Sequence, residues 1–291
     1  MNLSSKTAIK EILKRYQKHP RKKWGQNFLA DKNILHKIID LTGLNEKDYV
    51  IEIGPGIGVL SREIALRCKG VLAIEIDPSM QEVLSETMAD FDNFSLTIAD
   101  VLKVRSEQEL YRAFKLNQAE PYKVCANIPY NITTPIIFKL LEESPHLEYA
   151  VLMMQKEVAA RIKAAPGSKD YGLLTVMIQY YAEVEYLTDI SRNCFFPIPE
   201  VDSALIKITP HTCRRQLVNE EGFKSLVRRA FQMRRKTVLN ICSAEFAEEK
   251  ETVRRYLESM GIDSNRRPET LTLEDFVSLA ENWLGPKAEQ N

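Results

Sequence analysis

Five short apolar runs, separated by stretches with helical spacing, fill the middle of this 291-residue chain. The apolar runs span residues 50–53, 71–76, 94–98, 123–126 and 149–154. The stretches between them that have helical spacing span residues 60–67, 80–88, 110–116 and 135–142. Short continuous apolar runs are typical of parallel strands that are buried on both faces. Their alternation with helices predicts a doubly wound α/β sheet, in which ligands bind at the carboxyl ends of the strands.

The flanking segments predict further elements around this sheet. Residues 5–16, 33–41 and 172–181 have helical spacing, and residues 186–190 and 204–208 are expected to close the sheet as an antiparallel edge. After Pro210 the pattern changes to helical spacing with many charges and no strand pattern. We therefore expect a Rossmann-like domain with a basic N-terminal helix over residues 1–210, and a small helical domain over residues 211–291.

Charge is balanced over the whole chain but is unevenly distributed. The 40 Lys and Arg residues equal the 40 Asp and Glu residues, so the net charge is zero. Between residues 6 and 23 Glu11 is the sole acid among the cations Lys6, Lys10, Lys14, Arg15, Lys18, Arg21, Lys22 and Lys23. A second basic cluster consists of Lys224, Arg228, Arg229, Arg234, Arg235 and Lys236. Two such patches suit local contacts with a polyanion, although either one alone is also explained as a solvated helix face.

Several protein classes are not favoured by the sequence. No apolar run approaches the ~20 residues of a membrane-spanning helix, and the first ten residues lack the apolar core of a secretory signal. A mitochondrial presequence is the alternative for the basic N-terminal segment, and Glu11 argues against it. The five cysteines show no CxxC pair and no metal-ligand spacing. We expect reduced thiols in a cytoplasmic protein with no metal site.

The most specific motif is Val-Ile-Glu-Ile-Gly-Pro-Gly-Ile-Gly at residues 50–58, where the first predicted strand ends. Gly54, Gly56 and Gly58 predict a tight turn into a helix, and a backbone without Cβ atoms can approach a ligand closely. The GxGxG spacing differs from the GxGxxG of dinucleotide-binding loops. No basic residue lies in this loop to neutralise a diphosphate, which favours S-adenosyl-L-methionine over NAD.

Carboxylates follow the next two predicted strands. Glu75 lies about twenty residues after the loop, where an acid can accept hydrogen bonds from ribose hydroxyls. Asp100 follows the third strand and can accept a hydrogen bond from an adenine amino group; the alternative is an Asp that caps a turn. With Gly54, these strand ends predict a site for an adenosine-containing ligand without phosphate.

A third motif, Asn127-Ile128-Pro129-Tyr130, follows the fourth predicted strand. An exocyclic adenine nitrogen is a poor nucleophile because its lone pair is delocalised into the ring. The Asn127 side-chain oxygen and the carbonyl before Pro129 can each accept one of its N–H bonds and aim the amine at a methyl group, since proline fixes φ. Tyr130 can stack on the base. Taken alone, such a motif is also compatible with an ordinary turn.

Together these residues resemble the ribosomal RNA adenine N6-dimethyltransferase family. The resemblance covers about residues 20–285 and rests on residues 25–29, residues 52–58, Glu75, Asp100, residues 127–130 and residues 195–203. It implies that Asn27 and Leu29 contact S-adenosyl-L-methionine, together with Gly54, Glu75, Asp100 and Asn127. It also implies that Phe195 faces the second side of the flipped adenine, opposite Tyr130. Without the resemblance, Phe195 would be read as an ordinary packing residue.

Four further features resemble the small-subunit branch of this family. They are Pro55, Thr134-Pro135, Tyr171-Gly172 and Arg234-Arg235-Lys236-Thr237. The resemblance implies dimethylation of N6 of two adjacent adenosines in a hairpin loop near the 3′ end of 16S rRNA, during ribosome biogenesis. We expect a cytoplasmic monomer that acts on an immature 30S particle, with Arg234, Arg235 and Lys236 contacting the RNA.

Three alternatives remain open at this point. The first is a large-subunit (23S) rRNA adenine N6-dimethyltransferase of the macrolide-resistance type, which shares the cofactor and target motifs. The second is a non-catalytic RNA-binding or transcription-factor role on the same scaffold, against which the intact motifs argue. The third is a nucleotide-dependent oxidoreductase, which would bind NAD and ignore S-adenosylhomocysteine.

Overall fold

The structure is a computed structural model that describes residues 3–21, 24–117, 119–212 and 217–281. The chain divides into two compact units. The first unit comprises residues 1–159 and 184–210, and the second comprises residues 160–183 and 211–291. Relative to the boundary expected near residue 210, the second unit also includes helix α8 (Leu173–Tyr181).

A seven-stranded sheet forms the centre of the first unit, in the order β4-β3-β2-β5-β6-β9-β7. Its strands are β2 (Tyr49–Ile53), β3 (Gly70–Glu75), β4 (Phe94–Ile98), β5 (Tyr122–Asn127), β6 (Leu147–Gln155), β7 (Ala182–Ile190) and β9 (Ser203–Pro210). The first five are parallel, and β9 runs antiparallel to β6. The sequence therefore predicted the parallel strands and the antiparallel closure correctly.

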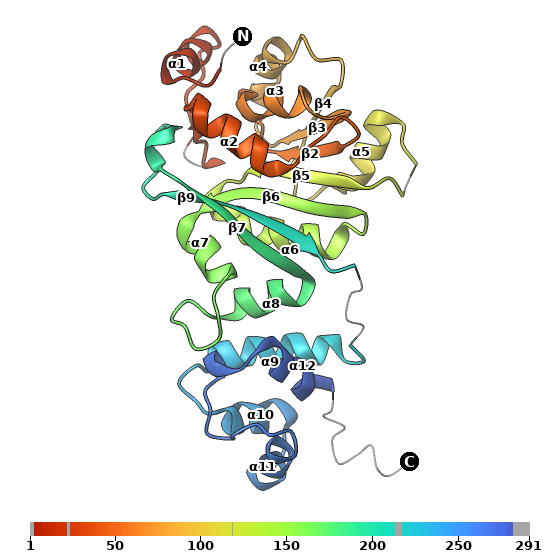
Figure 1. The fold of residues 1–291 in the computed structure, drawn as a ribbon, viewed down its shortest axis with the longest axis vertical. Helices are drawn as coiled ribbons and strands as arrows, with labels where there is room; N and C mark the ends of the chain where they lie inside the picture. Colours follow the sequence, from red (N-terminus) through yellow and green to blue (C-terminus); the bar gives the residue numbers. More distant parts are fainter. Residues whose placement is uncertain (1–2, 22–23, 118, 213–216, 282–291) are drawn as a thin grey trace. The chain divides into compact units, whose positions relative to one another are not determined.

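The strand order places a topological switch point between β2 and β5. From β2 the chain passes through α3 (Val59–Ala65) to β3 and through α4 (Gln81–Thr87) to β4. It then returns through α5 (Ser106–Phe114) to β5, on the other side of β2, and continues through α6 (Thr133–Glu143) to β6. Right-handed crossovers place the outward helices and the returning helices on opposite faces of the sheet, and Figure 1 shows α3 and α4 across the strands from α6. Ligands bind in the crevice at such a switch point.

Two capped helices precede the sheet. Helix α1 (Lys6–Arg15) begins at Ser5, whose hydroxyl accepts the Ala8 N–H at 3.2 Å. Helix α2 (Lys32–Thr42) begins at Asp31, whose carboxylate accepts the Ile34 N–H at 3.0 Å. Strand β1 (Phe28–Leu29) lies between these two helices in the sequence and pairs antiparallel with β8 (Phe195–Phe196), far along the chain. The sequence did not suggest this pairing.

The second unit is helical in its described part, as expected. It contains α8 together with α9 (Glu220–Gln232), α10 (Val238–Phe246), α11 (Lys250–Ser259) and α12 (Leu273–Glu281). Phe223, Leu226 and Phe276 are buried in its core. Helix α7 (Lys156–Ile162) was not predicted, because it follows β6 directly with no Gly or Pro to mark the boundary. Short 3₁₀ helices cover residues 78–80, 130–132, 192–194 and 268–270. Within the described ranges, every helix is too short or too polar to cross a membrane.

Candidate functional site

A pocket lies at the carboxyl edge of the sheet, next to the switch point between β2 and β5. Its lining brings together five predicted cofactor residues from four separate parts of the first unit: Asn27, Leu29, Gly54, Glu75 and Asn127. Pro129 of the predicted target motif lines it as well. These residues are up to 102 positions apart (27 to 129), so the fold, and not the local sequence, assembles the site.

The glycines of the loop that follows β2 have different roles. Gly54 and Gly56 both have positive φ, +71° and +58°, which favours glycine at each position. A Cβ atom at Gly56 would lie 2.7 Å from Cε1 of Phe28, so this glycine lets the β1 segment pack on the loop. A Cβ atom at Gly54 would meet nothing within 4 Å. Gly56 is therefore needed for packing within the protein, whereas Gly54 faces open space that a ligand can fill.

Glu75 is held in place by backbone donors at the end of β3. Its Oε2 accepts the Gly56 N–H at 3.2 Å, and its Oε1 accepts the Asp77 N–H at 2.9 Å. Burial raises the pKa of this carboxyl group, and the two N–H groups lower it. Each oxygen retains a second lone pair, so the fixed carboxylate can still accept hydrogen bonds from a ligand.

Glu52 also lines the pocket, and the sequence analysis assigned it no role. Its side chain is buried in the middle of β2, and its Oε2 has no hydrogen-bond partner among the described residues. Burial raises its pKa to about 8; the nearby Ser61 hydroxyl opposes this shift, and the negative charge of Glu75 adds to it. An unpartnered buried oxygen in a pocket wall fits a bound polar group. The sequence feature that could have indicated a role for Glu52 is that it is the single charged residue within an otherwise apolar run.

Asn127 ends β5 with its amide oriented by the N-terminal segment. Its Nδ2 donates to the carbonyl oxygen of Asn27 at 2.9 Å, and Nδ2 of Asn27 donates to the carbonyl of Gly25 at 3.1 Å. With Nδ2 of Asn127 engaged in this way, Oδ1 is the group left to accept a hydrogen bond from a substrate. The Ile128 N–H donates to the Met153 carbonyl at 3.0 Å, which anchors the Asn127–Ile128 peptide next to the Ile128 carbonyl that precedes Pro129.

The two predicted stacking residues are placed differently. The Tyr130 hydroxyl forms a 2.7 Å hydrogen bond with Oγ of Ser203, and burial raises the pKa of this tyrosine. Phe195 is 0% exposed and lies opposite Leu29 in the β1–β8 ribbon. Its ring therefore presents no open face to a base in this structure. Stacking by Phe195 opposite Tyr130 stays a prediction.

Asp100 is the predicted cofactor residue that the structure does not place in the pocket lining. One of its oxygens, Oδ1, accepts the Leu102 N–H at 3.0 Å, and Oδ2 lies 3.8 Å from Nζ of Lys103. This is the turn-capping arrangement that the sequence left open as the alternative. Its contact with adenine stays a prediction.

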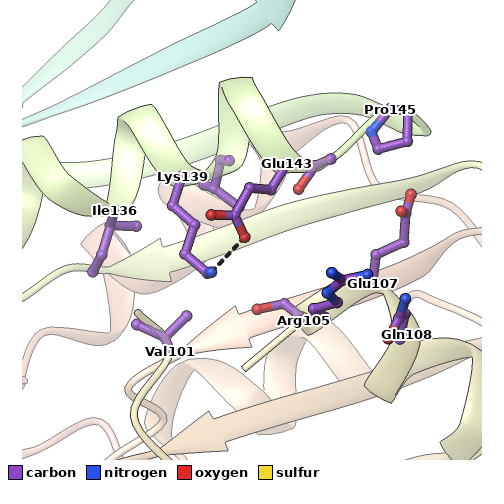
Figure 2. Close-up of a pocket in the computed structure, with 11 residues that line it drawn as sticks. Val101, Arg105, Glu107, Gln108, Ile136, Lys139, Glu143 and Pro145 are labelled. Atoms are coloured by element: carbon purple, nitrogen blue, oxygen red, sulfur yellow. Dashed lines mark hydrogen bonds and ion pairs between the residues drawn. The ribbon is translucent and has the colours of Figure 1, made fainter. Parts of the chain in front are cut away.

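A separate pocket lies between α5 and α6 (Figure 2). None of the predicted site residues lines it. Lys139 and Glu143, one turn apart on α6, form an ion pair of 2.6 Å (Figure 2). Glu107 forms a 3.0 Å contact with Nδ1 of His146, which lies outside the lining. Two of its four charged side chains, Lys139 and Glu143, thus pair with each other, and the predicted site residues lie in the other pocket, at the switch point.

The predicted RNA-binding residues Arg234, Arg235 and Lys236 follow α9 in the second unit and are exposed. Nη2 of Arg234 donates to the Tyr171 carbonyl within the same unit at 3.4 Å. Lys22, Lys23 and Cys213 lie outside the described residues. Among the residues that the structure does describe, no cluster of three or more His, Cys, Asp or Glu side chains is arranged to hold a metal ion.

Several known proteins are similar to this chain over most of its length. The family model of the ribosomal RNA adenine dimethylases matches residues 17–283. The chain is 44% identical to the Ribosomal RNA small subunit methyltransferase A of Geobacillus thermodenitrificans and 41% identical to that of Bacillus cytotoxicus, each over 98% of both chains. Among solved structures, a dimethyladenosine transferase from Plasmodium falciparum has a TM-score of 0.73 at 27% identity, covering 88% of this chain and 97% of its own. The 23S rRNA methyltransferase ErmE has a TM-score of 0.66 at 27% identity, covering 87% and 98%. The protein is thus a methyltransferase with the Rossmann-like fold, and its chain belongs to the ribosomal RNA adenine dimethylase family.

Proposed function

We propose that the protein transfers methyl groups from S-adenosyl-L-methionine to N6 of two adjacent adenosines in a hairpin loop near the 3′ end of small-subunit (16S) rRNA. The observation that carries the chemistry is the Asn127 amide, held by Asn27 at the wall of the pocket with Oδ1 left to accept. The choice of RNA is supported by relatives at 41–44% identity that are named as small-subunit methyltransferases. The protein is proposed to act in the cytoplasm as a monomer. Its substrate is proposed to be the RNA within an immature 30S particle.

The pocket fits S-adenosyl-L-methionine in its chemistry. Glu75 would accept hydrogen bonds from ribose hydroxyls, and the open space at Gly54 would admit the ligand close to the backbone. The unpartnered oxygen of Glu52, whose carboxyl group holds a proton below about pH 8, would form a hydrogen bond with a polar group of the ligand. Asn27 and Leu29 would close the site from the N-terminal segment, and Asp100 would bind the adenine amino group. When bound, the cofactor supplies a methyl group on a sulfonium, which needs no further activation.

The residues of the target motif then position the adenine amine. Oδ1 of Asn127 and the carbonyl before Pro129 would each accept one N–H of the amine, which directs its lone pair towards the methyl group. Tyr130 and Phe195 would hold the flipped base by stacking, which offsets the few kcal/mol needed to unstack it. Positioning and hydrogen bonding account for the rate, and the proton that the amine loses at each methyl addition passes to solvent.

RNA affinity is proposed to come in part from the second unit. Arg234, Arg235 and Lys236 are exposed and lie together in sequence, so they can reach and neutralise phosphates. The large-subunit alternative has a comparable fold in ErmE, at 27% identity. The higher identity to small-subunit relatives over 98% of both chains favours the small-subunit RNA.

The test is methylation by the purified protein with S-adenosyl-L-methionine that carries a labelled methyl group. Small-subunit and large-subunit RNA, each within its precursor particle, would be offered separately, and nuclease digests analysed by mass spectrometry. We expect label in dimethyladenosine from the small-subunit RNA alone. Label in the large-subunit RNA alone would support the alternative function.

A further inference from the structure

A basic groove lies beside the N-terminal helix, outside the cofactor pocket. Its walls are Lys10, Leu13 and Lys14 of α1, the residues 17–20 that follow, and Phe196 of β8. Leu13 is buried beneath it, and the Phe196 ring is half-buried. Nζ of Lys10 lies 5.2 Å from the centre of the Phe196 ring. The groove therefore combines an aromatic face with ammonium groups, the pair of features that binds single-stranded nucleic acid.

The cations of this segment fall into two groups. Arg15 pairs with Glu86, and Arg21 pairs with the buried Asp77 at 3.2 Å, so both arginines attach the segment to the rest of the first unit. Within the described ranges Lys10, Lys14 and Lys18 take part in no carboxylate ion pair, and the Lys10 ammonium lies over the Phe196 ring. Three such lysines along one groove leave positive charge available for an external anion.

The groove is linked to the cofactor pocket through the β1–β8 ribbon. Phe196 pairs in register with Phe28, and Phe28 and Leu29 of β1 line the cofactor pocket. The same two-residue ribbon thus contributes one strand to the pocket and the other to the groove. If one base of an RNA strand lies in the pocket, the nucleotides next to it in the strand would lie close to this ribbon.

We infer that this groove binds a nucleotide that flanks the target adenosine, with its base stacked on Phe196 and the adjacent phosphates on Lys10, Lys14 and Lys18. This subsite rests on the proposed function for the identity of the RNA. The ligand class itself, a single-stranded ribonucleotide segment, follows from the ring and the lysines. The site is independent of Arg234, Arg235 and Lys236, which belong to the second unit.

The experiment measures binding of the full chain to a fluorescent ten-nucleotide oligoadenylate by anisotropy over a range of salt concentrations. Phe196→Ala should weaken binding about tenfold, and Phe196→Tyr, which keeps a ring, should bind like the wild type. The triple variant Lys10→Ala/Lys14→Ala/Lys18→Ala should flatten the slope of log K against log salt by about 0.7 per lost phosphate contact. Lys47→Ala is the matched control, because Lys47 is exposed, forms no ion pair with the described residues and lies away from the groove. Calorimetry with S-adenosylhomocysteine, alongside circular dichroism, verifies that each variant is folded.

An unchanged salt slope in the triple variant would overturn the inference. So would a folded Phe196→Ala protein that binds as tightly as Phe196→Tyr. Lysine-dependent binding to phosphatidylserine vesicles, with oligoadenylate binding unaffected, would assign the groove to a membrane surface instead. If the wild type binds oligoadenylate through Phe196 but methylates no small-subunit RNA, the subsite stands and the proposed function fails.

Discussion

The two sides of the pocket are built by different means. On the cofactor side, Glu75 is fixed by two backbone N–H groups, and Gly56 is fitted against Phe28. On the target side, Asn127 and Tyr130 are held by side-chain contacts to Asn27 and Ser203, and Phe195 is fully covered. Glu75 and Gly56 are therefore fixed by contacts within the protein, although Asp100 stays outside the pocket lining, whereas the stacking proposed for Phe195 requires a ring face that this structure covers. We expect substitutions on the first side to change cofactor affinity, and those on the second to change the methylation rate.

The largest expected effect comes from Asn127→Ala. It removes the acceptor that we propose for the reacting amine, and loss of one fixed hydrogen bond in a transition state costs about 10²–10³ in rate. Binding of RNA should be nearly unchanged, because the interaction strengthens in the transition state. Single-turnover methylation and RNA binding would be measured together, with exposed Asn131→Ala as the matched control. A near-normal single-turnover rate in Asn127→Ala would remove this residue from the chemistry.

The second effect is on the other side of the pocket, where Glu75→Ala should weaken cofactor binding. Hydrogen bonds to a charged acceptor contribute about 1.5–3 kcal/mol each, so a loss of at least tenfold is expected by calorimetry. Glu75→Gln keeps one oxygen acceptor and should fall between the wild type and the alanine variant. Wild-type affinity in a folded Glu75→Ala protein would show that the ribose binds elsewhere.

Asn127 and Glu75 also show how much of the site could be predicted from the sequence alone. Strand ends that carry Gly54, Glu75 and Asn127 were predictable, because parallel strands bring their carboxyl ends to one edge. The hydrogen bond from the Asn127 side chain to the Asn27 carbonyl could not be predicted from the local sequence pattern, since it joins residues 100 positions apart. The β1–β8 ribbon was missed for the same reason, because two-residue strands carry no periodicity. Glu52 was overlooked because one acid within a strand does not indicate whether its oxygen finds a partner.

A smaller effect concerns Glu52 and pH. Its folded-state pKa of about 8 lies above the unfolded-state value of ~4.3, so the folded protein holds the extra proton between these pH values. Its contribution to the free energy of unfolding should fall as the pH rises towards 8, by at most about 1.4 kcal/mol per pH unit, and then level off. Denaturant unfolding of the wild type and Glu52→Gln at pH 5–9 would measure this, since the variant lacks the titrating group. Parallel pH profiles for the two proteins would contradict the assignment.

The smallest effect is expected for Tyr130→Phe and Ser203→Ala, which break the same 2.7 Å hydrogen bond. Each should lower the free energy of unfolding by about 1 kcal/mol and leave methylation within a few-fold of the wild type, because the ring at residue 130 is retained. Tyr130→Ala loses the ring and should methylate far more slowly. Equal impairment of Tyr130→Phe and Tyr130→Ala would mean that the hydroxyl, and not stacking, is what matters.

The most direct test of the account is mass spectrometry of small-subunit rRNA from a strain that lacks this protein, complemented with either the wild type or Asn127→Ala. We predict that the two adjacent dimethyladenosines near the 3′ end are absent without the protein, restored by the wild type and not restored by Asn127→Ala. Their persistence in the strain without the protein, or their full restoration by Asn127→Ala, would contradict the account.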